Sequence, residues 1–334
     1  MAEIQFLTGQ LLKLEYYTRG LSDLKIGKFI KNLFAIVLLV ALVYTARPAS
    51  LIDALKNLTF EAILYLLILS VVLIYVSALK WKLFLEEFGS SLPVLHLFNL
   101  YLVGYFVNLI LPSYLGGDAV RSWYAGKKTD QHHALAATIL ERYTGFVAMI
   151  ALGLIFMWFV EVANIKIKMA VILVAIFLVV VTWLSLNRKM LARLGRIKKL
   201  ETVIKHLSKI QEAFHLARAN RQLLIKALLL SLVFHTLTVV NTAVAAYAVG
   251  WYDPPIYDLF VVLPLILLIG AIPLSPNGLG IQEGAFYFFL TGVGASPGQA
   301  LAVAVVLRAK AYLLALMGGI VWFFVRGDKQ QGQH

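Results

Sequence analysis

The sequence predicts an all-α, polytopic membrane protein that forms a single transmembrane domain over residues 1–334. Of its residues, 61% are hydrophobic and only 14% are charged, whereas soluble domains are about half apolar and about a quarter charged. The chain also holds several apolar runs long enough to cross about 30 Å of hydrocarbon. Its net charge of +13 is concentrated in a few segments, which is typical of basic cytoplasmic loops. This composition excludes an ordinary soluble enzyme.

Six apolar runs are predicted to be full membrane spans. They are 29–46, 61–79, 134–160, 169–186, 223–249 and 299–325. Two further apolar segments, 95–111 and 258–273, differ from these. Each ends at a Pro- and Gly-rich break and is followed by a second short helical piece, at 116–128 and 281–293.

The positions of basic residues indicate whether the two interrupted segments cross the membrane. Between Asn187 and Gln222 there are ten Lys or Arg and two Glu, so this loop is expected in the cytoplasm. The N-terminal segment is also basic, and Lys80 and Lys82 follow the second span. If 95–111 crossed the membrane fully, the number of spans would place the basic N-terminus outside.

Two re-entrant helical hairpins remove this conflict. The first enters from the cytoplasm, breaks at Pro112 and returns through 116–128. The second, over 258–293, enters from outside, so that the N- and C-termini are both cytoplasmic. The predicted location is the cell (inner or plasma) membrane. The alternative is eight plain spans with one violation of the charge rule.

The two hairpins and the spans that follow them share a short sequence pattern. The matched positions are Pro112 with Pro276, Gly116 with Gly280, Ala134 with Ala300 and Arg142 with Arg308. Residues of about 61–160 and about 223–325 are therefore predicted to be two repeats of opposite membrane topology. Inverted repeats with broken helices are typical of transporters.

Residues at the breaks and inside the apolar segments form the candidate substrate-binding or translocation site. They are Gly116, Gly117, Asp118, Arg121, Glu141, Arg142, Asn277, Gly278, Gly280, Glu283, Arg308 and Lys310. Intramembrane ionisable groups are expensive and mark functional pathways. Arg142 and Arg308 lie about nine residues into their spans, which is about 13 Å deep. Together with two half-helix N-termini, they predict a site for an anion.

The carboxylates in this set have two possible roles. Asp118, Glu141 and Glu283 either orient the arginines through ion pairs or take up protons that couple transport to a gradient. Two purely structural interpretations compete with these, namely an intramembrane Glu141–Arg142 pair and a helix cap at Asp118. No catalytic residue, metal ligand or cofactor is predicted.

A basic amphipathic helix is predicted at about 188–221, because apolar residues recur there at helical spacing with lysines on the opposite face. It is expected either to lie on anionic lipid headgroups or to fold back onto the transmembrane helices.

Several motifs resemble those of the lysylphosphatidylglycerol synthase/flippase transmembrane family. The matching stretches are Leu111–Arg121, Glu141–Gly145, Pro276–Gly284, Arg308 and Gly318–Gly319. The resemblance covers about residues 25–326. It implies lipid translocation, with the motif residues lining the path of the headgroup. Some members of the family are fused to a soluble aminoacyl-transferase domain, which is not expected in a chain that stops at His334.

The leading hypothesis is therefore a flippase, and not an enzyme, that moves an anionic phospholipid or a polyprenyl-phosphate-type lipid. The alternatives are an intramembrane transferase that uses a lipid-phosphate donor, as some glycosyltransferases do, and a small-anion transporter. The expected partners are membrane lipids with anionic headgroups, and no nucleic acid. Proton coupling and a homodimer are both compatible with the sequence.

Overall fold

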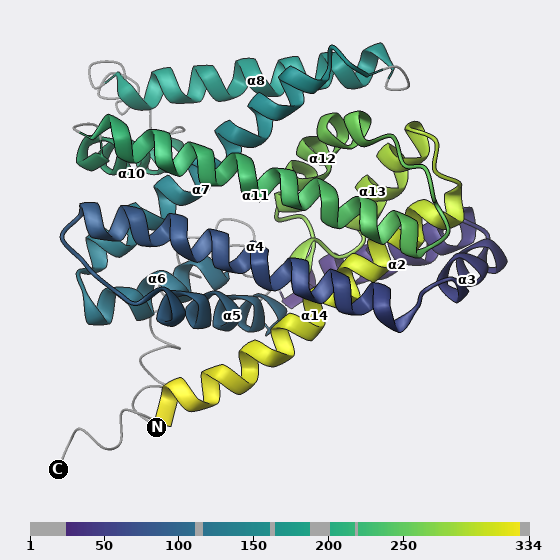
Figure 1. The fold of residues 1–334 in the computed structure, drawn as a ribbon, viewed down its shortest axis with the longest axis horizontal. Helices are drawn as coiled ribbons and strands as arrows, with labels where there is room; N and C mark the ends of the chain where they lie inside the picture. Colours follow the sequence, from purple (N-terminus) through teal and green to yellow (C-terminus); the bar gives the residue numbers. More distant parts are fainter. Residues whose placement is uncertain (1–24, 111–115, 161–163, 188–200, 218–219, 328–334) are drawn as a thin grey trace.

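The computed structural model describes residues 25–110, 116–160, 164–187, 201–217 and 220–327, and every long element in these ranges is an α-helix. The helices are α2 (Lys25–Thr45), α3 (Pro48–Lys56), α4 (Phe60–Glu87), α5 (Val94–Ile110), α6 (Gly116–Lys128), α7 (Gln131–Phe156), α8 (Ile165–Leu186), α10 (Glu201–Ala217), α11 (Arg221–Ala248), α12 (Ile256–Ala271), α13 (Ile281–Gly292) and α14 (Pro297–Gly327). A short 3₁₀ turn, η2 (Pro276–Gly278), precedes α13. Figure 1 shows their arrangement. The all-α prediction is confirmed for this part of the chain.

Five of the predicted spans are single long apolar helices. These are α4, α7, α8, α11 and α14. The predicted span 29–46 instead corresponds to α2, which turns by 82° into α3, so that the pair makes a sixth span only if it is counted as one. The bend occurs at Arg47, which has a positive φ of 61°. Helical geometry is disfavoured for Arg47 because it directly precedes Pro48. The chain is a multi-pass membrane protein.

Polar side chains fix the starts of the long helices. Each accepts a backbone N–H from the first turn, which would otherwise lack a partner. The caps are Thr59 to Ala62, Asp130 to His132 and His133, Asn164 to Lys166, and Asn220 to Leu223. All four helix starts lie before the predicted apolar runs, whose hydropathy alone therefore places the boundaries too late. Helices α4, α7, α8 and α11 begin one, three, four and two residues before the predicted spans.

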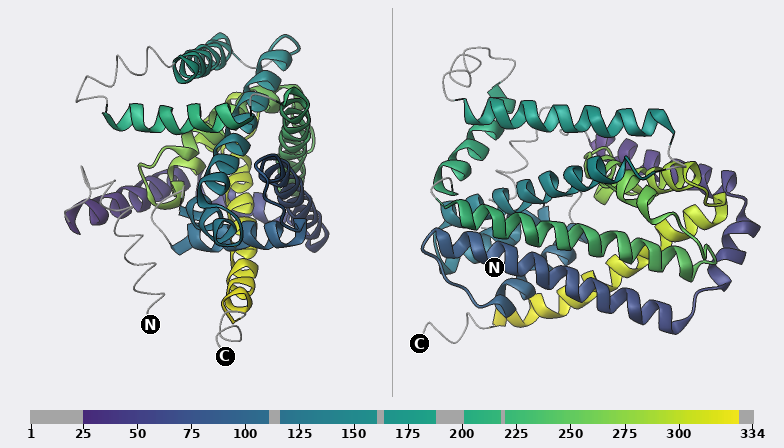
Figure 2. Two further views of the ribbon diagram at one scale, coloured as in Figure 1. Left: turned by 90° about the vertical axis from the view of Figure 1, so that its left-hand side faces the viewer. Right: turned by 45° about the horizontal axis from the view of Figure 1, so that its top comes forward.

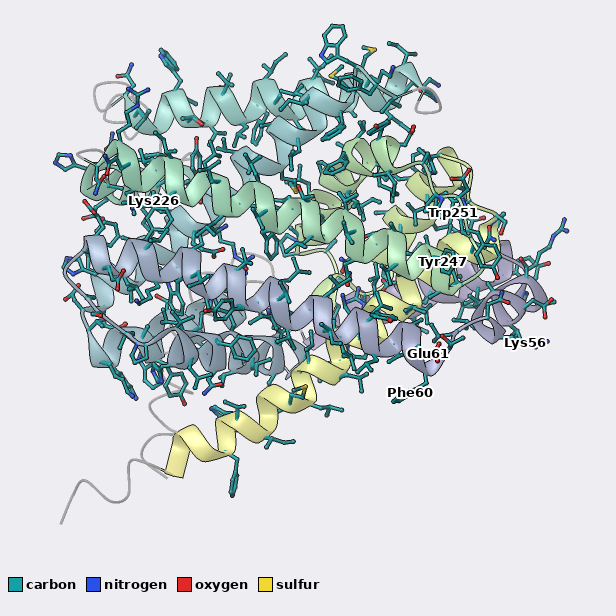
Figure 3. The ribbon with its side chains drawn as sticks, in the orientation of Figure 1. Lys56, Phe60, Glu61, Lys226, Tyr247 and Trp251 are labelled. Carbon is teal, nitrogen blue, oxygen red and sulfur yellow. The ribbon has the colours of Figure 1, made fainter. Side chains whose placement is uncertain are left out.

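Helices α4 and α11 form a long antiparallel pair through the molecule (Figure 1). Figure 3 shows Phe60 and Glu61, at the start of α4, near Tyr247, at the end of α11. Lys226 lies near the opposite end of α11 in the same view. The pair therefore runs along most of the helical bundle (Figure 1) and carries residues from both predicted repeats.

The short helices pack as two pairs, α5 with α6 and α12 with α13. In each pair, glycines let the two backbones approach closely. A Cβ on Gly117 would lie 2.3 Å from the carbonyl oxygen of Gly104, and one on Gly278 would lie 2.8 Å from that of Gly270. The first pair then packs on α7 and the second on α14. The break at Pro112, with residues 111–115, lies outside the described residues.

Helices α8 and α10 lie at the side of the bundle. Both views of Figure 2 show α8 at its edge, and most of its large apolar side chains are exposed. Helix α10 packs against α7 and α8, with Ala213 and Ala217 buried and the ring of Phe214 against that of Tyr143. The described part of the predicted amphipathic helix therefore folds back onto the transmembrane helices. Its predicted start, 188–200, lies outside the described residues.

The closest helix contact joins α14 to α5. A Cβ built on Gly318 would lie 1.9 Å from the carbonyl oxygen of Leu102, and one on Gly319 would lie 2.9 Å from the ring of Phe106. Membrane helices associate through such small residues because lipid tails leave little hydrophobic drive between them. This contact joins the second predicted repeat to the first.

Gly318→Ala is expected to destabilise the protein, because the new methyl group must push α14 away from the backbone of α5. The expected loss in free energy of unfolding is about 3 kcal/mol, the upper part of the usual range for overpacking. The measurement is thermal unfolding of the purified protein in detergent.

Gly284→Ala is the matched control, since its Cβ would meet only Leu42, at 3.8 Å. It is expected to leave the protein unchanged or to stabilise it by about 0.5 kcal/mol, because alanine is favoured over glycine inside a helix. Equal melting temperatures for the two variants would contradict the packing of α14 on α5.

Candidate functional site

A cavity of about 450 Å³ lies between the two predicted repeats and is lined by side chains from both. Eight charged residues line it. They are Lys80, Asp118, Arg121, Glu141, Arg142, Glu283, Arg308 and Lys310. Asn277 and Gly117 also line the cavity. The structure therefore brings the charged residues of the sequence-predicted site together around one space.

An alternating chain of charges connects α4, α6 and α7. Lys80 lies 3.2 Å from Glu141 Oε1, and Arg121 Nη2 donates to Glu141 Oε2 at 2.8 Å. Arg121 Nε also donates to Asp118 at 3.0 Å. Asp118 in turn accepts from Nε and Nη2 of Arg142, at 2.8 and 2.6 Å. Each carboxylate in the chain therefore binds two cations.

Arg121 is the most enclosed member of the chain, with 1% of its surface exposed. Its guanidinium carbon lies 4.6 Å from the ring centre of Trp81 and 4.1 Å from that of Tyr101, distances that allow cation–π attraction. These contacts and the two carboxylates hold Arg121 in place. Its Nη1 has no hydrogen-bond partner among the residues that the structure describes.

The second repeat pairs Arg308 of α14 with Glu283 of α13, at 2.5 Å. Arg308 also donates to the carbonyl oxygens of Asn277 and Gly278, at 2.9 and 3.4 Å, and to the side chain of Gln282 at 3.2 Å. In this way it holds the break before α13. Arg142 and Arg308 are each the twelfth residue of their helix, and each binds a carboxylate in the first turn of a short helix.

The N-termini of the two short helices already have acceptors for part of their N–H groups. Gly117 N–H donates to Asn108 of α5 at 2.6 Å, and Gly280 N–H donates to Glu283 at 2.7 Å. The second break depends on three residues with positive φ, namely Asn277, Gly278 and Gly280. Glycine and asparagine tolerate this conformation. Gly278 and Gly280 thus shape the backbone, and neither they nor Gly116 line the cavity.

The cations Arg142 and Lys310 have different surroundings. The side chain of Arg142 is 46% exposed although it is bound to Asp118. Lys310 donates to the neutral side chain of Asn241 at 3.1 Å, and no carboxylate among the described residues forms an ion pair with it. Both side chains line the cavity.

The family of the chain follows from its match to known proteins. Residues 29–319 match the model of the lysylphosphatidylglycerol synthase TM region. The chain belongs to this family. A UPF0104 membrane protein of Methanothermobacter thermautotrophicus is 25% identical over 312 residues, which cover 85% of this chain and 91% of that protein. A UPF0104 membrane protein of Methanocaldococcus jannaschii is 23% identical over 308 residues, with the same two coverages. The resemblance noted in the sequence is confirmed.

Sequence reasoning missed several polar residues of the cavity. Lys80 was assigned to the cytoplasmic end of the second span, but α4 continues to Glu87 and buries Lys80 beside Glu141. The signal was an apolar helical pattern that continues past Lys80 through Trp81, Phe84 and Leu85. Other missed polar residues include Asn108, His235, Asn241 and Gln282. They carry no full charge at neutral pH, so they do not stand out in an apolar sequence.

Glu141→Gln is expected to destabilise the protein by about 3–5 kcal/mol, the usual cost of breaking a buried ion pair by removing one partner. It leaves Lys80 without its carboxylate and Arg121 with only Asp118. The side chains of Lys80 and Glu141 are only 3% and 5% exposed. Thermal or denaturant unfolding in detergent measures the loss.

Glu86→Gln is the control on the same bundle. It breaks the Lys82–Glu86 pair, which has a similar distance of 2.8 Å but is partly exposed, and is expected to cost less than about 1 kcal/mol. If Glu141→Gln were no more harmful than this control, the charge chain would not stabilise the fold.

Proposed function

We propose that this membrane protein is a flippase that moves an anionic phospholipid or a polyprenyl-phosphate-type lipid across the bilayer. The observation that carries the proposal is the cavity between the repeats, whose described lining has five cations and three carboxylates. A surplus of positive charge among membrane-spanning helices favours an anionic ligand. Membership of the lysylphosphatidylglycerol synthase TM family is consistent with a lipid ligand.

In this proposal the α5–α6 and α12–α13 pairs are re-entrant hairpins that enter from opposite faces of the membrane. Two observations support the arrangement. Each pair contacts the long helix that follows it, α7 or α14, and each supplies a first-turn carboxylate to the arginine of that helix. The inverted topology places the N- and C-termini in the cytoplasm. Alternating access comes from movement of one repeat against the other.

The contacts divide the charged residues into two groups. Arg308 uses its donors on Glu283, Gln282 and the break before α13, so it positions the second hairpin. Arg142, whose side chain is 46% exposed, and Lys310, which forms no ion pair with a described carboxylate, bind the headgroup phosphate. An arginine offers parallel hydrogen bonds to such a group. The acyl chains remain in the surrounding lipid.

The same contacts favour ion pairing as the role of the carboxylates. Asp118, Glu141 and Glu283 each have a cation within 3.2 Å. In this proposal the three groups therefore hold the arginines and Lys80 in place.

Arg142→Gln is expected to slow leaflet exchange of a fluorescent anionic lipid at least tenfold, which corresponds to about 1.4 kcal/mol of lost interaction in the rate-limiting step. The protein is reconstituted into liposomes, and the exchanged fraction is measured by quenching of the outer leaflet. Asp118 keeps its second partner, Arg121, so the variant is expected to fold.

Lys226→Gln is the matched control. Lys226 is an exposed cation on α11 and does not line the cavity, and Figure 3 shows it near one end of the bundle. Its loss is expected to leave exchange unchanged. Exchange that continued at the wild-type rate in Arg142→Gln would refute the assignment of Arg142 to the headgroup.

A further inference from the structure

The charge surplus of the cavity is divided equally between the two repeats. Among the residues that line it, the first repeat has three cations, Lys80, Arg121 and Arg142, against two carboxylates. In the second repeat Glu283 balances Arg308, and Lys310 has no carboxylate. Each repeat therefore contributes one positive charge that no described lining residue neutralises. The sequence between α5 and α6, Leu111–Leu115, contains no charged residue.

Each surplus charge can be assigned to one side chain that lines the cavity. In the first repeat the alternating chain ends at Arg142, which is 46% exposed, whereas Lys80 and Arg121 are enclosed. In the second repeat the surplus charge is that of Lys310, whose hydrogen-bond partner Asn241 is neutral. A ligand in the cavity can meet one such cation from each side.

We propose that the headgroup bound in this cavity carries about two negative charges, as a phosphate monoester or a diphosphate does. This inference rests on the proposed function and narrows its substrate class. Uncompensated charges are costly inside a membrane protein, so a ligand of matching charge is favoured over one that leaves a surplus. Arg142 and Lys310 are its direct ligands.

The common lipid headgroups differ in this charge. A phosphodiester of a neutral alcohol carries one negative charge. A phosphodiester of an amino alcohol is zwitterionic, because its ammonium group offsets the charge of the phosphate. A phosphate monoester carries about 1.5 to 2 negative charges at pH 7. The site therefore selects a lipid with a terminal phosphate or diphosphate over one whose phosphate is linked to a neutral alcohol.

A binding competition tests this selection independently of transport. The full-length protein, purified in detergent, is titrated with phosphatidic acid and with phosphatidylglycerol of the same acyl chains. The first is a phosphate monoester and the second is a phosphodiester. Wild-type protein is expected to bind phosphatidic acid at least tenfold more tightly. Inorganic phosphate and diphosphate are added as competitors to separate a lipid headgroup from a free anion.

Lys310→Gln removes one of the two surplus charges and is expected to bring the ratio of the two affinities close to one. Lys310→Arg keeps the charge and is expected to keep the preference. Lys226→Gln, which changes the net charge by the same amount outside the cavity, is expected to have no effect on the ratio.

The outcomes separate this inference from the proposed function. Equal affinities in wild-type protein, or an unchanged ratio in Lys310→Gln, would overturn the headgroup charge even if leaflet exchange occurs. A strong preference for phosphatidic acid without leaflet exchange would support the charge and refute the flippase. Displacement of phosphatidic acid by equally low concentrations of free phosphate would support the charge but identify a soluble anion as the ligand.

Discussion

Charge neutralisation inside a membrane bundle is the constraint on which the rest of this structure depends. Arg121 is enclosed by aromatic rings, where an unpaired guanidinium would be very costly. Glu141 and Asp118 make its burial possible and are themselves held by Lys80 and Arg142. Because these five residues lie on α4, α6 and α7, pairing the charges also fixes the relative positions of three helices.

The two predicted repeats use the same kind of ion pair for different purposes. In both, an arginine at the twelfth position of a long helix binds a carboxylate at the start of a short helix. Arg308 has backbone carbonyls as additional partners and is mostly covered. Arg142 has no such carbonyl partner within the described part of the chain, and its side chain is 46% exposed. An approximate repeat thus produces one arginine that stabilises a break and one that faces the cavity.

The sequence predicted most of the helices, because five long apolar runs leave little choice in a bilayer. It did not predict the bend after α2, since this depends on the conformation of Arg47 before Pro48. The sequence singled out seven of the eight charged residues that line the cavity, because ionisable residues stand out in apolar helices. Lys80 was misplaced because a lysine near the end of an apolar run resembles a loop residue. Asn108 and Asn241 acquire their roles only through contacts between helices.

The contact between Leu102 and Gly318 also has a consequence for biosynthesis. The two residues are 216 positions apart in the chain, and a ribosome adds about 5–20 residues per second. Roughly 10–40 seconds therefore pass between the synthesis of Leu102 in α5 and that of Gly318 in α14. During that interval the first repeat is inserted without its closest partner, which makes α5 a natural site for temporary protection by insertion machinery.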